Sequence, residues 1–70
     1  MKISARNIIP GKIVSVKKGP ITTLVVLEIA KGVKVTSSIT SDAAKDLKLA
    51  KGKAAYALIK ASSILVGVDD

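Results

Sequence analysis

Two short polar clusters interrupt an otherwise apolar sequence and carry the side chains best suited to chemistry. The first is Ser4-Ala5-Arg6-Asn7, and the second is Lys60-Ala61-Ser62-Ser63. Each cluster combines one cation with hydroxyl groups, and neither contains a carboxylate. A tetrahedral dianion only accepts hydrogen bonds, so it needs the N–H fork of Arg, the ammonium of Lys, hydroxyls and backbone N–H groups. The two clusters are therefore candidate ligands for a small oxyanion.

A third run of hydroxyl side chains carries no charge and comprises Thr36, Ser37, Ser38, Thr40 and Ser41. It ends where the sequence predicts the start of a short helix, whose free N–H groups and dipole also favour an anion. A purely structural explanation stays open at this point. Arg6 could pair with a surface carboxylate, and small polar clusters at strand ends are common in soluble domains.

Catalytic chemistry has little support in the sequence. The chain has no His and no Cys, so a nucleophile would lack its usual base and a metal its commonest soft ligands. Asp42 and Asp46 are four residues apart, as expected of the solvated face of a helix start, and no Gly-rich phosphate loop is present. We expect no catalytic residues, no direct metal ligands and no enzymatic activity.

The elements that must position these clusters are short strands. Turn signals cut the chain at Pro10-Gly11, Lys18-Gly19-Pro20, Lys31-Gly32 and Lys51-Gly52. They leave five predicted strands at residues 7–17, 21–29, 34–40, 54–60 and 63–68. A helix capped by Thr40 or Ser41, and ended by Gly52, falls between the third and fourth strands. The sequence predicts an all-β fold, a five-stranded OB-like barrel with one short helix.

Alternation along the first two strands assigns side chains to two faces. In the first strand, Ile13 is expected on one face and Val16 on the other. In the second, Leu24 and Val26 oppose Val25 and Leu27. Both faces are apolar at mid-strand, which suggests that one face fills the barrel and the other meets a partner chain.

The composition favours a small oligomer with a basic surface. The chain has 70 residues, 49% of them apolar and 1% aromatic, and its net charge is +7. A single domain this small usually needs extra stabilisation from disulfides, a bound metal or subunit association. Because the chain has no Cys or His, subunit association remains, although a tightly packed aliphatic monomer is an alternative. The charge attracts nucleic acid, acidic membranes or small oxyanions. With neither a signal peptide nor a span of ~20 apolar residues, we expect a cytoplasmic protein that does not bind membranes.

The same polar clusters lie within a longer resemblance. Ser4-Ala5-Arg6-Asn7, Gly11 and the Val16-Lys17-Lys18-Gly19 stretch resemble the opening of Mop domains, the molbindins. The match continues through Leu27-Glu28-Ile29, Val35-Thr36-Ser37, Lys51-Gly52-Lys53 and Ile59-Lys60-Ala61-Ser62. The resemblance implies a single Mop domain over residues 1–70, with an OB-like barrel. It also implies a homohexamer, a trimer of dimers, that holds molybdate or tungstate between subunits as a cytoplasmic store for molybdenum homeostasis.

The resemblance further implies two kinds of oxyanion site. The main site would use Ser4, Arg6, Lys60, Ala61 through its backbone N–H, and Ser62, with Thr40 contributed by a neighbouring subunit. A second site near the threefold axes would use Lys18, Gly19, Ile21 and Thr22. Pro20 departs from the family pattern and removes one backbone donor from that stretch.

The main alternative is an OB-like protein that binds single-stranded nucleic acid. The charge favours it, but such proteins stack bases on aromatic side chains and this chain offers only Tyr56. A further alternative is a module that serves only in protein assembly and binds no oxyanion, with its basic residues exposed to solvent. We therefore expect a small oxyanion and further copies of the chain as partners, and no nucleic acid. A pocket that offers only hydrogen-bond donors disfavours protonated phosphate, whose P–OH group needs an acceptor. Molybdate and tungstate are nearly the same size, so the sequence does not predict which of the two is preferred.

Overall fold

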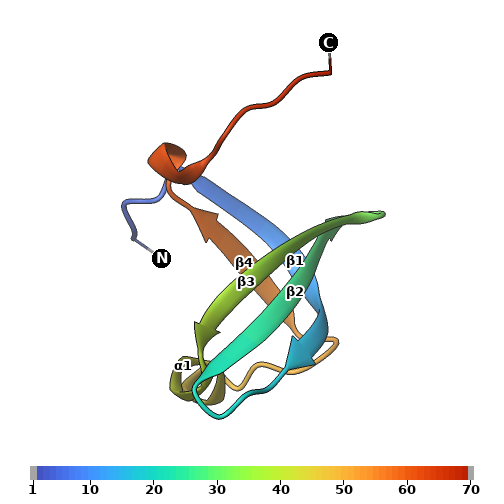
Figure 1. Ribbon diagram of the computed structural model, residues 1–70, viewed down its shortest axis with the longest axis vertical. Coiled ribbons are helices and arrows are strands. Elements are labelled where there is room, and N and C mark those ends of the chain that lie inside the picture. The colour runs from blue at the N-terminus through green and yellow to red at the C-terminus, as the bar shows by residue number, and fades with distance from the viewer. Residues whose placement is uncertain (1, 70) are drawn as a thin grey trace.

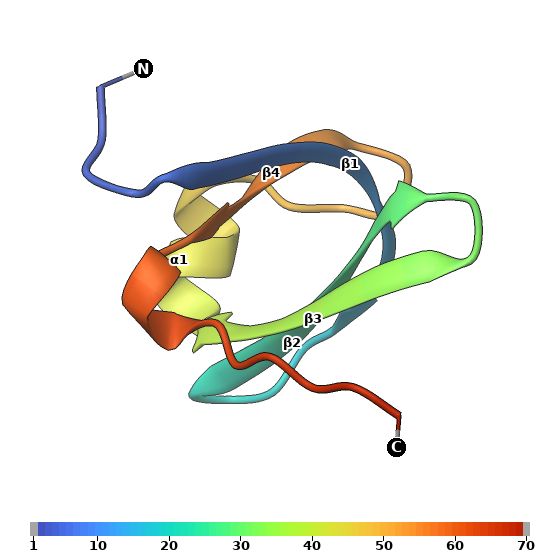
Figure 2. The same cartoon turned by 90° about the horizontal axis from the view of Figure 1, so that it is seen from above.

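Four antiparallel strands form one curled sheet in the computed structural model, which describes residues 2–69. The elements in chain order are β1 (Asn7–Lys17), β2 (Thr22–Ala30), β3 (Val33–Thr40), α1 (Ser41–Asp46), β4 (Ala54–Ile59) and a 3₁₀ turn, η1 (Ala61–Ser63). The strand order across the sheet is β3-β2-β1-β4 (Figure 1). Seen from above, the sheet curls round so that β4 and β3 approach from opposite sides (Figure 2).

The core is aliphatic and lies on the inner face of this curl. Ile13, Val25 and Leu27 are its buried residues, at 1%, 3% and 5% exposure. Thr23, Val25 and Leu27 alternate with exposed or half-buried neighbours along β2, as the period of a strand requires. The predicted separation of Val25 and Leu27 from exposed Leu24 is therefore confirmed.

A β-bulge in β1 corrects the predicted faces of that strand. Ile13 pairs with Leu27 and Ser15 pairs with Val26, so Val14 is an extra residue on the β1 side. The insertion reverses the alternation, and Val16 packs against the core on the same side as Ile13. The prediction that Ile13 and Val16 lie on opposite faces was wrong, because it assumed an uninterrupted period of two.

The helix begins where the sequence predicts, but Gly52 does not end it. Thr40 is the N-cap, and its Oγ1 accepts a hydrogen bond of 3.1 Å from the Ala43 backbone N–H. The helix stops at Asp46, and Lys48 takes the left-handed conformation, with φ of 53°. The side-chain Nζ of Lys53 then donates to the carbonyls of Leu47 and Lys48, at 2.7 and 3.2 Å.

The predicted fifth strand is absent, so the predicted five-stranded barrel is a four-stranded half-barrel. Beyond η1, residues 64–69 form no strand. Leu65, Val66 and Val68 are 94%, 91% and 84% exposed. A short run of aliphatic residues is typical of a strand, but a strand also needs a neighbour to pair with, and this segment leaves the domain (Figure 1). The predicted fourth strand was also one residue too long, since β4 ends at Ile59.

Candidate functional site

Pairing of β1 with β4 brings the two charged clusters to the same end of the sheet. The register runs from Lys12 opposite Ala54 to Asn7 opposite Ile59. One residue further along both strands are Arg6 and Lys60, the cations of the two clusters. The side-chain Nδ2 of Asn7 donates a 3.1 Å hydrogen bond to the Ile59 carbonyl, which ties the two segments together beside these cations.

Backbone donors at this end come from the η1 turn. Lys60 is its N-cap, and the first hydrogen bond inside the turn runs from the Ser63 N–H to the Lys60 carbonyl, at 2.9 Å. A 3₁₀ turn bonds each N–H to the carbonyl three residues earlier, so the N–H groups of Ala61 and Ser62 are not used within it. These are the residues that the resemblance assigns to the main site together with Ser4, Arg6 and Lys60.

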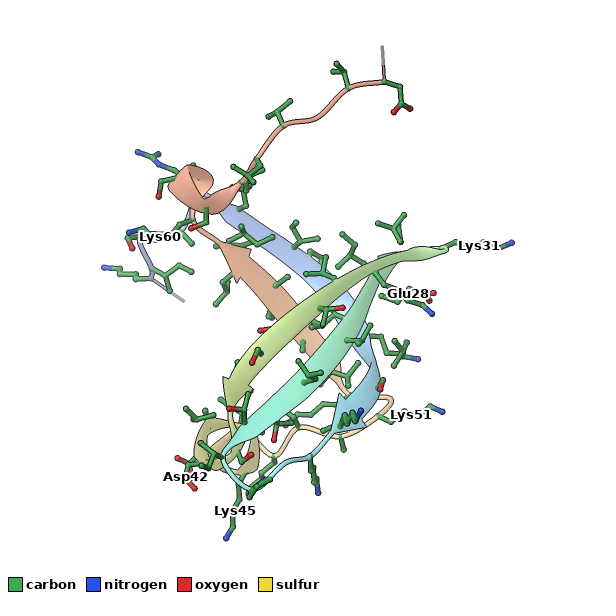
Figure 3. The ribbon with its side chains drawn as sticks, in the orientation of Figure 1. Glu28, Lys31, Asp42, Lys45, Lys51 and Lys60 are labelled. Atoms are coloured by element: carbon green, nitrogen blue, oxygen red, sulfur yellow. The ribbon has the colours of Figure 1, made fainter. Side chains whose placement is uncertain are left out.

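Hydrogen-bond donors without a carboxylate therefore gather at one end of β1 and β4. We name Ser4, Arg6, Lys60, Ala61 and Ser62 the donor cluster; all five are exposed in the isolated chain. The labelled carboxylates lie elsewhere in Figure 3, Glu28 beside the β2–β3 turn and Asp42 at the helix end of the sheet. Glu28 also lies opposite Lys12 and Lys34 in the sheet, which offsets its charge.

Thr40 is not part of the donor cluster within one chain. It lies at the far end of β3, where it caps α1, whereas the donor cluster lies at the opposite end of the sheet (Figures 1 and 3). Its Oγ1 already accepts from the Ala43 N–H, so its hydroxyl hydrogen is the group left for a ligand. A second copy of the chain would have to bring Thr40 to the donor cluster.

The residues predicted for the second site lie in the β1–β2 connection, near α1. Ile21 is 76% exposed, and its carbonyl accepts a 2.7 Å hydrogen bond from the Ser41 N–H. The Gly19 carbonyl accepts one of 2.6 Å from Ser41 Oγ, which in turn lies 2.8 Å from Thr23 Oγ1. Since Ser41 has a single hydroxyl hydrogen and gives it to Gly19, Thr23 is the donor in the second bond.

A basic hollow of about 450 Å³ lies beside this connection. Two of the predicted residues, Lys18 and Gly19, line it, whereas Ile21 and Thr22 do not. Lys45 and Lys48 line it as well, and the sequence analysis did not single them out. Lys45 lies in the last turn of α1, whereas Lys48 lies beyond its end in the left-handed conformation, so no helical spacing in the sequence indicated that both line this hollow.

No group of three or more acidic, His or Cys side chains that could hold a metal ion is found among residues 2–69. In the same part of the chain, no helix has the length and apolar character needed to cross a bilayer.

Comparison with known proteins finds relatives that match nearly the whole chain. The family model described as the TOBE domain matches residues 3–66. A probable molybdenum-pterin-binding protein of Haemophilus influenzae is 46% identical over 69 residues, which is 99% of this chain and 100% of the relative. Molybdenum-pterin-binding protein 3 of Clostridium pasteurianum is 50% identical and covers 94% of this chain and 97% of its own length.

Solved structures agree with this fold. MopII from Clostridium pasteurianum superposes with a TM-score of 0.88 at 42% identity, covering 96% of this chain and 100% of its own. A molybdate-binding protein from Sporomusa ovata gives 0.90 at 34% identity, covering 97% and 100%. ModG, described as a cytoplasmic molybdate-binding protein and solved with molybdate bound, gives 0.92 at 36% identity, covering 99% of this chain and 49% of its own. The chain therefore belongs to the TOBE domain family, among the Mop-type members that it was predicted to resemble.

Proposed function

We propose that the protein binds molybdate or tungstate through the donor cluster, at an interface between copies of the chain, and performs no catalysis. The observation that carries this proposal is the pairing of Asn7 with Ile59, which brings the two polar clusters, neither of which contains a carboxylate, to the same end of the sheet. The names of the relatives support the ligand, since they describe binding of molybdate or of molybdenum-pterin.

The exposure of the donor cluster supports subunit assembly as part of this proposal. A dianion that stays in water gains little from surface cations, because water and salt screen the interaction. Tight binding requires that the ligand lose much of its hydration to donors that surround it. In one chain the donor cluster is exposed at one end of the sheet, and Thr40 lies at the other end. We propose that a second copy supplies the missing side with its Thr40, within a homo-oligomer that is hexameric.

Two further parts of the proposal concern the second site and the biological role. A second oxyanion site is proposed near the threefold axes of that oligomer, formed by Lys18, Gly19, Ile21 and Thr22. The protein would act as a cytoplasmic store of the oxyanion. The description of ModG as cytoplasmic supports this location.

Calorimetric titration tests the proposal and separates it from nucleic-acid binding. Molybdate, tungstate, sulfate and phosphate are titrated at one ionic strength, and a short single-stranded oligonucleotide is titrated in low and in moderate salt. We expect micromolar or tighter binding of molybdate and tungstate, and weak phosphate binding, since phosphate is partly protonated near neutral pH and the cluster offers donors only. We expect no oligonucleotide binding in moderate salt, because Tyr56 is the one aromatic residue. Absence of molybdate and tungstate binding at micromolar concentrations contradicts the proposal.

A further inference from the structure

Ser41, the first residue of α1, makes three hydrogen bonds that tie the start of the helix to β2 and to the connection before it. Its backbone N–H donates to the Ile21 carbonyl at 2.7 Å, and its Oγ donates to the Gly19 carbonyl at 2.6 Å. The same Oγ accepts from Oγ1 of Thr23, a side chain that is 1% exposed, at 2.8 Å. The Ser41 hydroxyl therefore joins α1 to a segment 22 positions earlier in the chain.

The β1–β2 connection that anchors Ser41 is stiff. Pro20 lies within it, and the proline ring fixes one of the backbone angles. A Cβ atom on Gly19 would lie 2.5 Å from the Thr22 carbonyl oxygen, so the chain folds back closely on itself here. Because a stiff segment resists displacement, the hydrogen bond to the Gly19 carbonyl holds the first turn of α1 at a defined place. Pro20, which departs from the family pattern, contributes to this stiffness.

α1 needs such an anchor because it is short. It has six residues, and isolated helices of fewer than about 12 residues are marginal in water. The far end of the helix is held by Lys53, whose Nζ donates to the Leu47 and Lys48 carbonyls. The first turn is held by Ser41, with Ala44 buried beside it. Loss of the Ser41 hydroxyl should therefore loosen the first turn while leaving the far end of the helix fixed.

The direction of the Thr40 side chain depends on this first turn. The backbone of Thr40 lies opposite Thr22 in the sheet, whereas its Oγ1 accepts a 3.1 Å hydrogen bond from the Ala43 N–H of α1. That bond leaves the hydroxyl hydrogen of Thr40 for a ligand, and the position of the Ala43 N–H sets where this hydrogen points. A hydrogen bond weakens steeply as it bends, so a displaced first turn would misdirect the Thr40 hydroxyl.

We propose that Ser41 is a positioning residue of the oxyanion site: its bond to the Gly19 carbonyl holds the first turn of α1 and so aims the Thr40 hydroxyl at an oxyanion in the donor cluster of a second copy. Ser41 acts without touching the oxyanion through its side chain, since its one hydroxyl hydrogen is given to Gly19. The inference rests on the proposed function, which assigns Thr40 to that site.

A double-mutant cycle with Thr40 separates positioning from a general loss of stability. Thr40→Ala, Ser41→Ala and the combined variant are titrated with molybdate, at concentrations where size-exclusion chromatography shows each protein assembled as wild type is. We expect Thr40→Ala to bind about tenfold more weakly and Ser41→Ala about fivefold. If Ser41 acts through Thr40, the combined variant should bind no more than about twofold more weakly than Thr40→Ala, whereas independent effects would multiply to about fiftyfold.

Two further variants control for the chemistry of the Ser41 side chain. Thr23→Val removes the donor to Ser41 but keeps the bond between Ser41 and the Gly19 carbonyl, so we expect it to bind molybdate like wild type. Ser41→Thr retains a hydroxyl and should restore most of the affinity that Ser41→Ala loses. A Thr23→Val protein that loses as much affinity as Ser41→Ala would contradict the role given to the bond with Gly19.

Hydrogen exchange without any oxyanion tests the positioning separately from the proposed function. The Ala43 amide reports its bond to Thr40 Oγ1, and the amides of β2 in the same protein correct for global stability. We expect the corrected exchange of Ala43 to be faster in Ser41→Ala than in wild type and Thr23→Val. Unchanged Ala43 exchange overturns the inference, and so does wild-type molybdate affinity in Ser41→Ala or in Thr40→Ala. Wild type that binds no molybdate overturns the proposed function, whereas faster Ala43 exchange in Ser41→Ala then still supports the positioning of Thr40 by Ser41.

Discussion

Asn7 and Ile59 lie opposite one another in β1 and β4, and the Asn7 side-chain Nδ2 donates a 3.1 Å hydrogen bond to the Ile59 carbonyl. The two residues are 52 positions apart in the chain. Arg6 directly precedes Asn7 and Lys60 directly follows Ile59, and both are cations of the donor cluster. This one pairing therefore brings the two clusters to the same end of the sheet.

Replacing Arg6 with Ala should weaken molybdate binding by about 10–100-fold, because the loss of a charged hydrogen-bond donor costs about 1.5–3 kcal/mol. Titration calorimetry measures the change. Lys31→Ala is the matched control, since Lys31 lies at the β2–β3 turn, far from Lys60 (Figure 3), and should change the affinity little. Equal losses in the two variants would mean that net charge, rather than contact, governs binding.

Asn7→Ala should lower the free energy of unfolding by about 0.5–1.5 kcal/mol, since it removes a half-buried hydrogen bond. It should also weaken molybdate binding severalfold although Arg6 and Lys60 are both present, because the two segments lose the bond that aligns them. Urea unfolding and calorimetry measure the two effects. Ser38→Ala, on an exposed position of β3, serves as the control. An unchanged molybdate affinity in a measurably destabilised Asn7→Ala protein would show that this bond is not needed to align the cluster.

Ser41→Ala should destabilise the fold more than Thr23→Val. Thr23 is 1% exposed and its hydroxyl donates to Ser41 Oγ, which donates to the Gly19 carbonyl. Removing Ser41 Oγ leaves a buried hydroxyl without its acceptor, at a cost of about 1–3 kcal/mol, whereas Thr23→Val removes that donor and keeps the bond to Gly19. Urea unfolding of both variants gives the comparison. A larger loss of unfolding free energy in Thr23→Val than in Ser41→Ala would contradict this explanation and show that the Thr23 hydroxyl contributes more to stability than Ser41.

Lys48→Gly and Gly52→Ala should change stability in opposite directions. Lys48 has φ of 53° and Gly52 has φ of 93°, both in the left-handed region. A Cβ atom in this region costs about 1–2 kcal/mol, which Lys48 bears in the native protein and Gly52 avoids. We expect Lys48→Gly to raise the thermal midpoint slightly and Gly52→Ala to lower it. A Cβ at Gly52 would have no heavy atom within 4 Å, so any loss reports backbone conformation rather than a clash.

The sequence alone determined the approximate positions of β1 to β4, the helix start and the chemical character of the donor cluster. Short-range rules suffice for these: Gly and Pro mark the turns, alternation marks β2, and Thr40 caps α1 because its side chain meets an N–H three residues away. The absence of carboxylates from both polar clusters is also a property of the sequence. Which family the chain belongs to followed from the same residues.

Only the tertiary structure decided what depends on pairing between distant segments. The bulge at Val14, which turns Val16 toward the core, depends on how β1 and β2 align. A prediction based on strict alternation of side chains along a strand cannot include such a bulge. The placement of Arg6 and Lys60 at one end of the sheet and of Thr40 at the other depends on strand order and register. Residues 63–68 have the pattern of a strand but no partner edge in one chain, because a strand's hydrogen bonds are made with a neighbour that the local sequence does not specify.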